Sequence, residues 1–146
     1  MSMDTLENRT GYANIAAIPE IGNFTNILFY LRKNNVNWQY LNYLKEITTL
    51  NDEIISSWLN INPKTLRAYR KPESVLKDNV KEHLVLIISL YKHGTDVFES
   101  KENFDKWLQT KNRFLDNIPP KDFLDTIIGI KFIDDQLVAI EYGDNV

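Results

Sequence analysis

The stretch from Asn51 to Arg70 constrains the fold most, because it reads as two short helices joined by a tight turn. Asn51 and Asn62 are good helix N-caps, and Pro63 suits the first position of a helix. Between the helices, Asn60 is the kind of non-glycine residue that tolerates a left-handed backbone. The remaining apolar residues recur at helical spacing and give each helix one apolar face: Ile54, Ile55, Trp58, Leu59, Leu66 and Tyr69. The pattern predicts a helix-turn-helix.

In DNA-binding proteins of this layout, the second helix lies in the major groove with its N-terminal residues against base edges. The candidate DNA-binding residues on and around that helix are Asn62, Lys64, Thr65, Arg67, Arg70 and Lys71. From residue 63 to residue 81 there are six bases and two acids, so positive charge is concentrated there. The alternative interpretation is a helical hairpin that serves only as scaffold and touches no DNA.

The rest of the composition excludes several classes of protein. The chain has 146 residues, no cysteine, 43% hydrophobic residues and a net charge of −3. Without cysteine there is no disulfide framework and no thiolate zinc ligand, and the two histidines, His83 and His93, lie ten residues apart without a ligating carboxylate beside them. No glycine-rich phosphate loop, serine elbow or metal motif is present. We therefore expect no catalytic residues, no enzyme, no cofactor, no metal and no small-molecule substrate.

The N-terminus and the apolar segments indicate where in the cell the protein is expected. No apolar run reaches the roughly 20 residues that a membrane span requires, and the N-terminus lacks a secretion signal. We expect a cytoplasmic protein that does not contact a membrane. From residue 95 to residue 146 there are eleven acids and six bases, a balance that favours a protein partner over phosphate.

The expected fold is mainly α: a helical bundle with a helix-turn-helix, followed by a small α+β C-terminal domain with a short β-hairpin. The expected parts are an N-terminal arm (1–22), a helical domain (23–94) and a C-terminal domain (95–146). Residues 80–91 are apolar on nearly all sides, which predicts a helix buried in the core or in a homodimer interface. Gly94 and Gly129 are predicted to end helices. Residues 130–133 and 137–142 are predicted to pair as strands around a turn at 134–136.

The C-terminal third contains an ordered series of short motifs. They are Phe104-Asp105-Lys106-Trp107-Leu108, Asn112, Leu115, Ile118-Pro119, Phe123-Leu124-Asp125-Thr126, Gly129, Leu137 and Ile140-Glu141-Tyr142-Gly143. This series resembles the toxin-binding domain of the Xre/MbcA/ParS antitoxin family over about residues 100–143. Antitoxins of the Xre type also carry a helix-turn-helix upstream, where residues 34–71 stand here. Thr65, Leu66 and Arg67 resemble the recognition helix of that family, although Lys64 stands where arginine is more usual.

The resemblance implies a function. The chain would be the antitoxin of a type II toxin–antitoxin system, whose C-terminal end covers the active site of a RES-domain toxin that degrades NAD. The resemblance also implies a homodimer. Its helix-turn-helix would repress the shared promoter. The implied toxin-binding residues are Trp107, Leu108, Ile140, Glu141, Tyr142, Gly143, Asp144, Asn145 and Val146. The alternative function is a stand-alone helix-turn-helix transcriptional regulator without a cognate toxin.

Overall fold

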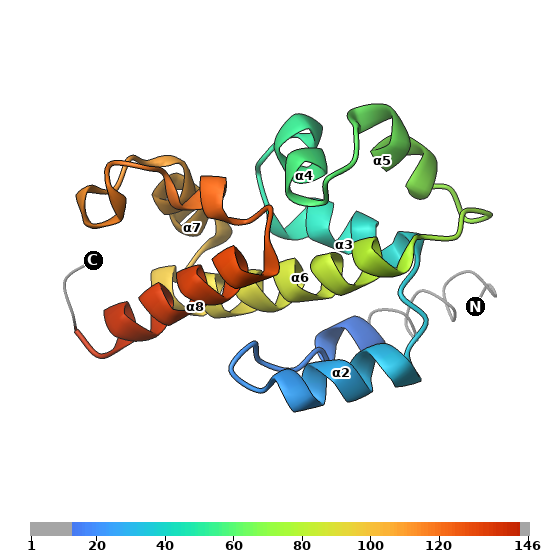
Figure 1. Cartoon of the computed structure of the whole chain (residues 1–146), viewed down its shortest axis with the longest axis horizontal. Coiled ribbons are helices and arrows are strands. Elements are labelled where there is room, and N and C mark those ends of the chain that lie inside the picture. The colour runs from blue at the N-terminus through green and yellow to red at the C-terminus, as the bar shows by residue number, and fades with distance from the viewer. Residues whose placement is uncertain (1–12, 144–146) are drawn as a thin grey trace.

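The computed structural model describes residues 13–143, and the elements in this part of the chain are helices. After a short helical turn at 13–16 the chain forms α2 (Phe24–Lys33), α3 (Trp38–Ile47), α4 (Asp52–Trp58), α5 (Pro63–Tyr69), α6 (Asp78–Phe98) and α7 (Lys101–Gln109). Two 3₁₀ helices, η1 (Arg113–Leu115) and η2 (Pro120–Phe123), lead to the last helix, α8 (Ile127–Glu141). Figure 1 shows α6 running through the middle of the molecule, with α8 alongside it, α2 on one side and the α4–α5 pair on the other.

The long helix α6 is the core of the protein. Its apolar residues are at most 2% exposed from Val80 to Tyr91, on every side of the helix. The surrounding helices of the same chain supply this burial, since α3, α7 and α8 pack against α6. Of the two interpretations of this apolar segment, the core is therefore the one that the structure supports. A homodimer, if it forms, uses another surface.

The helix starts predicted from asparagine residues are present. The Asn51 side chain accepts a hydrogen bond from the backbone N–H of Ile54 (3.0 Å), and Asn62 accepts one from Thr65 N–H (2.7 Å). Asn60 has a φ of 58°, the left-handed conformation expected at the bend between α4 and α5. These features depend on residues within a few positions of one another, which is why the sequence indicated them.

The predicted C-terminal α+β domain with a β-hairpin is wrong. Both predicted strands and the intervening turn lie in the single helix α8, except for Tyr142, which caps its C-terminus, and no strand occurs in residues 13–143. The reason is the spacing of three fully buried residues, Ile130, Ile133 and Leu137, which form one face of a helix that packs against α6. Thr126 starts this helix by accepting a hydrogen bond from Gly129 N–H (2.9 Å), so Gly129 lies in its first turn instead of ending the helix before it.

Gly94 also fails to end a helix, because α6 continues to Phe98 and ends at Glu99, whose φ is 70°. Its role is to make room. A Cβ atom on Gly94 would lie 2.3 Å from Cζ of Phe104, a fully buried ring on α7. Gly94 thus allows α7 to approach α6 closely.

The segment before α2 is tied to α6. Ile15, Ile18 and Ile21 are buried, and the Lys92 ammonium group donates to the backbone carbonyls of Ile15 and Ala16 at 2.9 Å each. The helix α6 runs without interruption across residues 94 and 95, where the sequence analysis placed a domain boundary. The division into an arm and two domains stays a prediction.

Candidate functional site

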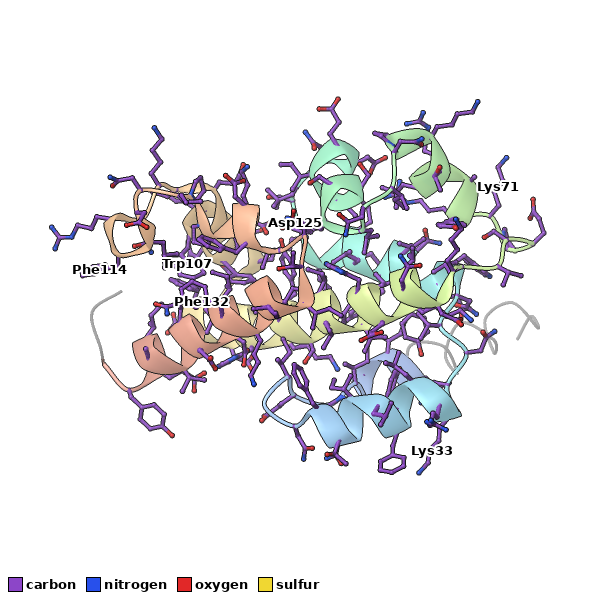
Figure 2. The ribbon with its side chains drawn as sticks, viewed as in Figure 1. Lys33, Lys71, Trp107, Phe114, Asp125 and Phe132 are labelled. Atoms are coloured by element: carbon purple, nitrogen blue, oxygen red, sulfur yellow. The ribbon has the colours of Figure 1, made fainter. Side chains whose placement is uncertain are left out.

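The α4–α5 pair has the packing of a compact helical hairpin. Ile55, Leu59 and Leu66 are at most 1% exposed, and the small Ser56 is buried where the two helices approach. Among the predicted DNA-binding residues, Lys64, Arg67 and Lys71 are exposed and Thr65 is half-buried. Figure 2 shows Lys71 at the end of the molecule farthest from Phe114. The structure therefore leaves three basic side chains of this region open to a partner.

Arg70 is occupied within the chain. Its guanidinium group donates two hydrogen bonds to the Asp52 carboxylate, at 3.0 and 2.9 Å, and Lys45 donates a third at 3.0 Å. These hydrogen bonds, that from Arg70 first, hold the pKa of Asp52 well below its usual range, so the carboxylate stays charged. Because Asp52 begins α4 and Arg70 follows α5, the pair fixes the two helices relative to each other. Asn62, as the α5 cap, is likewise engaged.

Three side chains, one each from α4, the α4–α5 turn and α6, contact the segment that precedes α8. Trp58 Nε1 donates to the carbonyl of Lys121 (3.0 Å), Asn60 Nδ2 donates to the carbonyl of Asp125 (3.0 Å), and His83 Nε2 lies 2.7 Å from the carbonyl of Leu124. Figure 2 places Asp125 between the beginning of α8 and α4. The α4–α5 turn therefore helps to set where α8 begins.

The buried carboxylate of Asp105 joins α7 to α6 and to the segment before α4. Asp105, on α7, is 1% exposed and accepts four hydrogen bonds: from Tyr91 OH (2.7 Å), Thr48 Oγ1 (3.0 Å), Thr49 Oγ1 (2.8 Å) and Thr49 N–H (2.6 Å). Burial raises the pKa of Tyr91 well above its usual value, and the nearby Asp105 adds to this, so the phenol keeps its proton and donates. Four donors satisfy a carboxylate that would otherwise be costly to bury. The threonines directly precede α4, so α7 fixes the entry to the α4–α5 hairpin.

The predicted toxin-binding residues fall into two groups. Leu108 is fully buried, and Trp107 is half-buried with its ring centroid 5.4 Å from that of Phe98, so both lie in the core around α7. Ile140 is half-buried, whereas Tyr142 is 82% exposed and Gly143 is exposed with a φ of 81°. Asp144, Asn145 and Val146 lie outside the described residues.

Glu141 contacts His93, which lies between two carboxylates. His93 Nδ1 is 2.6 Å from Asp134 Oδ1, and His93 Nε2 contacts Glu141 Oε1. The Asp134 hydrogen bond is the main cause of a raised pKa of His93, despite its partial burial. These groups line a cleft of about 610 Å³ between residues 16–22, α6 and α8. Within residues 13–143, no group of three histidine and acidic side chains is arranged to hold a metal ion.

The outward face of α8 is the site that sequence reasoning missed. Opposite its buried row, this helix exposes Ile128 (83%), Phe132 (37%), Val138 (38%) and Tyr142, the last at its C-terminal end. We call these four residues the α8 face. Of these four residues the sequence analysis named only Tyr142, because Ile128 lies before the predicted hairpin and the prediction assigned Phe132 and Val138 to two separate strands. Large apolar side chains exposed on one side of a helix, here with the exposed Lys131 and Asp135 among them, are a candidate surface for binding another protein.

Comparison with known protein families gives one match. Residues 93–143 match the model of the antitoxin Xre/MbcA/ParS C-terminal toxin-binding domain. The match runs from His93 in the last part of α6 through α7 and α8 to Gly143, so it contains the whole α8 face. It confirms the resemblance inferred from the C-terminal motifs. No curated protein matches the chain, and no helix in residues 13–143 is long and apolar enough to cross a bilayer.

Proposed function

Because residues 93–143 form an antitoxin-type toxin-binding domain, we propose that this protein is the antitoxin of a type II toxin–antitoxin system. The toxin that the sequence resemblance implies is a RES-domain enzyme that degrades NAD. The antitoxin neutralises it by covering the active site with the C-terminal end of the domain. Autoregulation of the shared promoter and a homodimeric state are further parts of this proposal.

The observation that carries the proposal is the α8 face. It lies inside the matched segment, and its residue Ile128 is among the most exposed large apolar side chains of the described part. A soluble protein gains about 25 cal/mol for each Å² of such surface that a partner covers. Tyr142 is the last residue of the α8 face. A toxin bound to this face would therefore also contact the C-terminal tail, which we expect to enter the active site of the toxin.

A matched pair of variants tests this surface. The protein is co-expressed with the product of the neighbouring reading frame, which this proposal expects to be a RES-like toxin, and growth and co-purification are recorded. We expect Ile128→Glu to lose both, because it places a charge on the most exposed large apolar side chain of the proposed contact. Val75→Glu serves as the control, since Val75 is 80% exposed but lies before α6, outside the matched segment. Retention of full neutralisation by Ile128→Glu would refute toxin binding through α8.

A deletion tests whether residues 142–146 are needed for neutralisation. Deletion of residues 142–146 is expected to abolish neutralisation, because the active site is then left open. The α8 residues that remain should still hold the toxin with reduced affinity, so co-purification distinguishes lost contact from lost inhibition. Full neutralisation by the shortened chain contradicts coverage of the active site by the C-terminal end.

The alternative is a stand-alone transcriptional regulator, which the exposed bases of the α4–α5 hairpin favour. The two functions share DNA binding, and both predict that Lys64→Ala and Arg67→Ala weaken operator binding by about 1–3 kcal/mol each where they contact bases. They differ in the toxin, so the presence of a RES-like reading frame beside this one, with rescue on co-expression, separates them. If wild-type protein fails to shift promoter DNA at low salt, the hairpin is scaffold alone.

A further inference from the structure

Exposed apolar side chains also occur on α2, which contacts α8. The ring of Phe24, the first residue of α2, lies against Lys131 of α8, with the Lys131 ammonium group 5.1 Å from the ring centroid. Lys131 is one turn after Ile128 on the same side of the helix. On α2, Leu28 follows Phe24 by one turn. Phe24 is 41% exposed and Leu28 is 51% exposed. Lys131 therefore lies between the exposed apolar side chains of α2 and those of α8.

We propose that the toxin-binding surface extends from the α8 face onto α2, with Phe24 and Leu28 as additional contact residues. This inference rests on the proposed function, since it takes the partner on α8 to be the toxin. It goes further in assigning binding residues to a helix that ends 60 residues before the matched segment. The family-matched domain alone would then form only part of the toxin-binding site.

The charges around this surface select a toxin over a second copy of the chain. Helix α2 contains no acidic residue and carries Arg32 one turn after Leu28, while Lys131 adds a second base at the junction with α8. In a two-fold dimer the same patch faces itself, so bases on one copy would oppose bases on the other. Asp135, one turn after Lys131, offsets only one of them. The fitting partner presents apolar side chains flanked by carboxylates that meet Lys131 and Arg32.

Two neighbouring residues of α2 provide a matched test. Leu28 and Phe29 are both 51% exposed, but Leu28 lies on the side of Phe24, whereas Phe29 lies about 140° around the helix from Phe24. We expect Leu28→Glu to weaken binding of the full-length protein to an inactivated toxin at least about tenfold, because an interface anchor becomes a charge facing carboxylates. Phe29→Glu should stay within about twofold of wild type. Binding is measured by calorimetry, and circular dichroism checks that both variants are folded.

The outcomes separate this inference from the proposed function. Loss of affinity in Leu28→Glu but not in Phe29→Glu supports the extension onto α2. Equal affinities of the two variants, with Ile128→Glu still defective, overturn the extension and leave toxin binding through α8 intact. Unchanged affinity in Ile128→Glu overturns both. If Leu28→Glu instead converts a dimer into a monomer in light scattering without changing toxin affinity, the α2 surface joins two copies of this chain and the inference is wrong.

Discussion

Replacing Gly129 by alanine tests the close approach that fixes the first turn of α8. A Cβ atom at this position would lie 1.7 Å from the backbone oxygen of Phe123. A carbon and a carbonyl oxygen normally stay about 3.3 Å apart or more, so one of them would have to move by roughly 1.5 Å. The Phe123 carbonyl has little room to retreat, because the carbonyls of Lys121 and Leu124 on either side are held by Trp58 and His83.

The expected cost follows from three contributions. Overpacking costs about 1–3 kcal/mol, and displacement of the turn weakens the Thr126 cap by about 1 kcal/mol. Alanine returns about 1 kcal/mol through its higher helix propensity. We therefore expect Gly129→Ala to lower the free energy of unfolding by about 2 kcal/mol, which for a chain of this size is a melting temperature lower by roughly 4–8 °C.

Urea denaturation followed by circular dichroism measures this change, provided that the slope of the free energy against urea concentration is the same as in wild type. Gly22→Ala is the control, since a Cβ there has no atom within 4 Å, and we expect a change below about 0.5 kcal/mol. If Gly129→Ala unfolds at the wild-type urea concentration or above it, α8 does not begin where we describe it.

Two further predictions concern charged groups. Asp52→Asn should lower the free energy of unfolding by about 1–2 kcal/mol in urea denaturation, because it removes the charge that Arg70 and Lys45 contact; an unchanged midpoint would show that this pairing contributes nothing. His93 has a pKa raised above its usual value, chiefly by Asp134, so its stabilising effect is complete below about pH 6.5 and disappears as pH rises through the raised pKa. The melting temperature should therefore fall between pH 6 and pH 8.5 by more in wild type than in His93→Gln, and equal slopes would contradict a protonated His93 between its carboxylates.

The local features of this fold could be predicted from the sequence, because the interacting atoms are close along the chain. The caps at Asn51 and Asn62 each join residues three positions apart, and the bend at Asn60 depends on the backbone of one residue. The resemblance to the antitoxin domain also depended on an ordered series of residues and not on the secondary structure assigned to them. It was therefore confirmed although the predicted hairpin was wrong.

The errors arose where tertiary packing decides between local alternatives. Gly94 and Gly129 look like helix ends in isolation, but each is the small residue that lets another segment approach a helix, Phe104 in the first case and the Phe123 carbonyl in the second. Asp134-Asp135 resembles a turn, yet Asp134 is buried beside His93, 41 positions earlier in the chain. Contacts at such separations leave no periodic signal in the sequence.

The same applies to the candidate site. Nothing in the spacing of Arg70 indicates that Asp52, 18 positions away, occupies its guanidinium group. Exposed bases near a predicted recognition helix therefore could not be divided by sequence into those that brace the hairpin and those that face outward. The α8 face required the correct secondary structure before its four residues could be recognised as one surface.

The buried Asp105 limits how this protein can exchange parts with its relatives. Its four donors come from α6 and from the loop that precedes α4, so a recombinant in which only residues 93–143 were replaced by another domain of the matched type would retain Thr48 and Thr49 facing a foreign side chain. An apolar replacement there would leave the buried hydroxyls of Thr48 and Tyr91 without their carboxylate acceptor, whereas the exposed Thr49 could still bond to water. We expect such an exchange to be tolerated when the incoming segment keeps an acid at position 105, or when residues 48 and 49 are exchanged together with it.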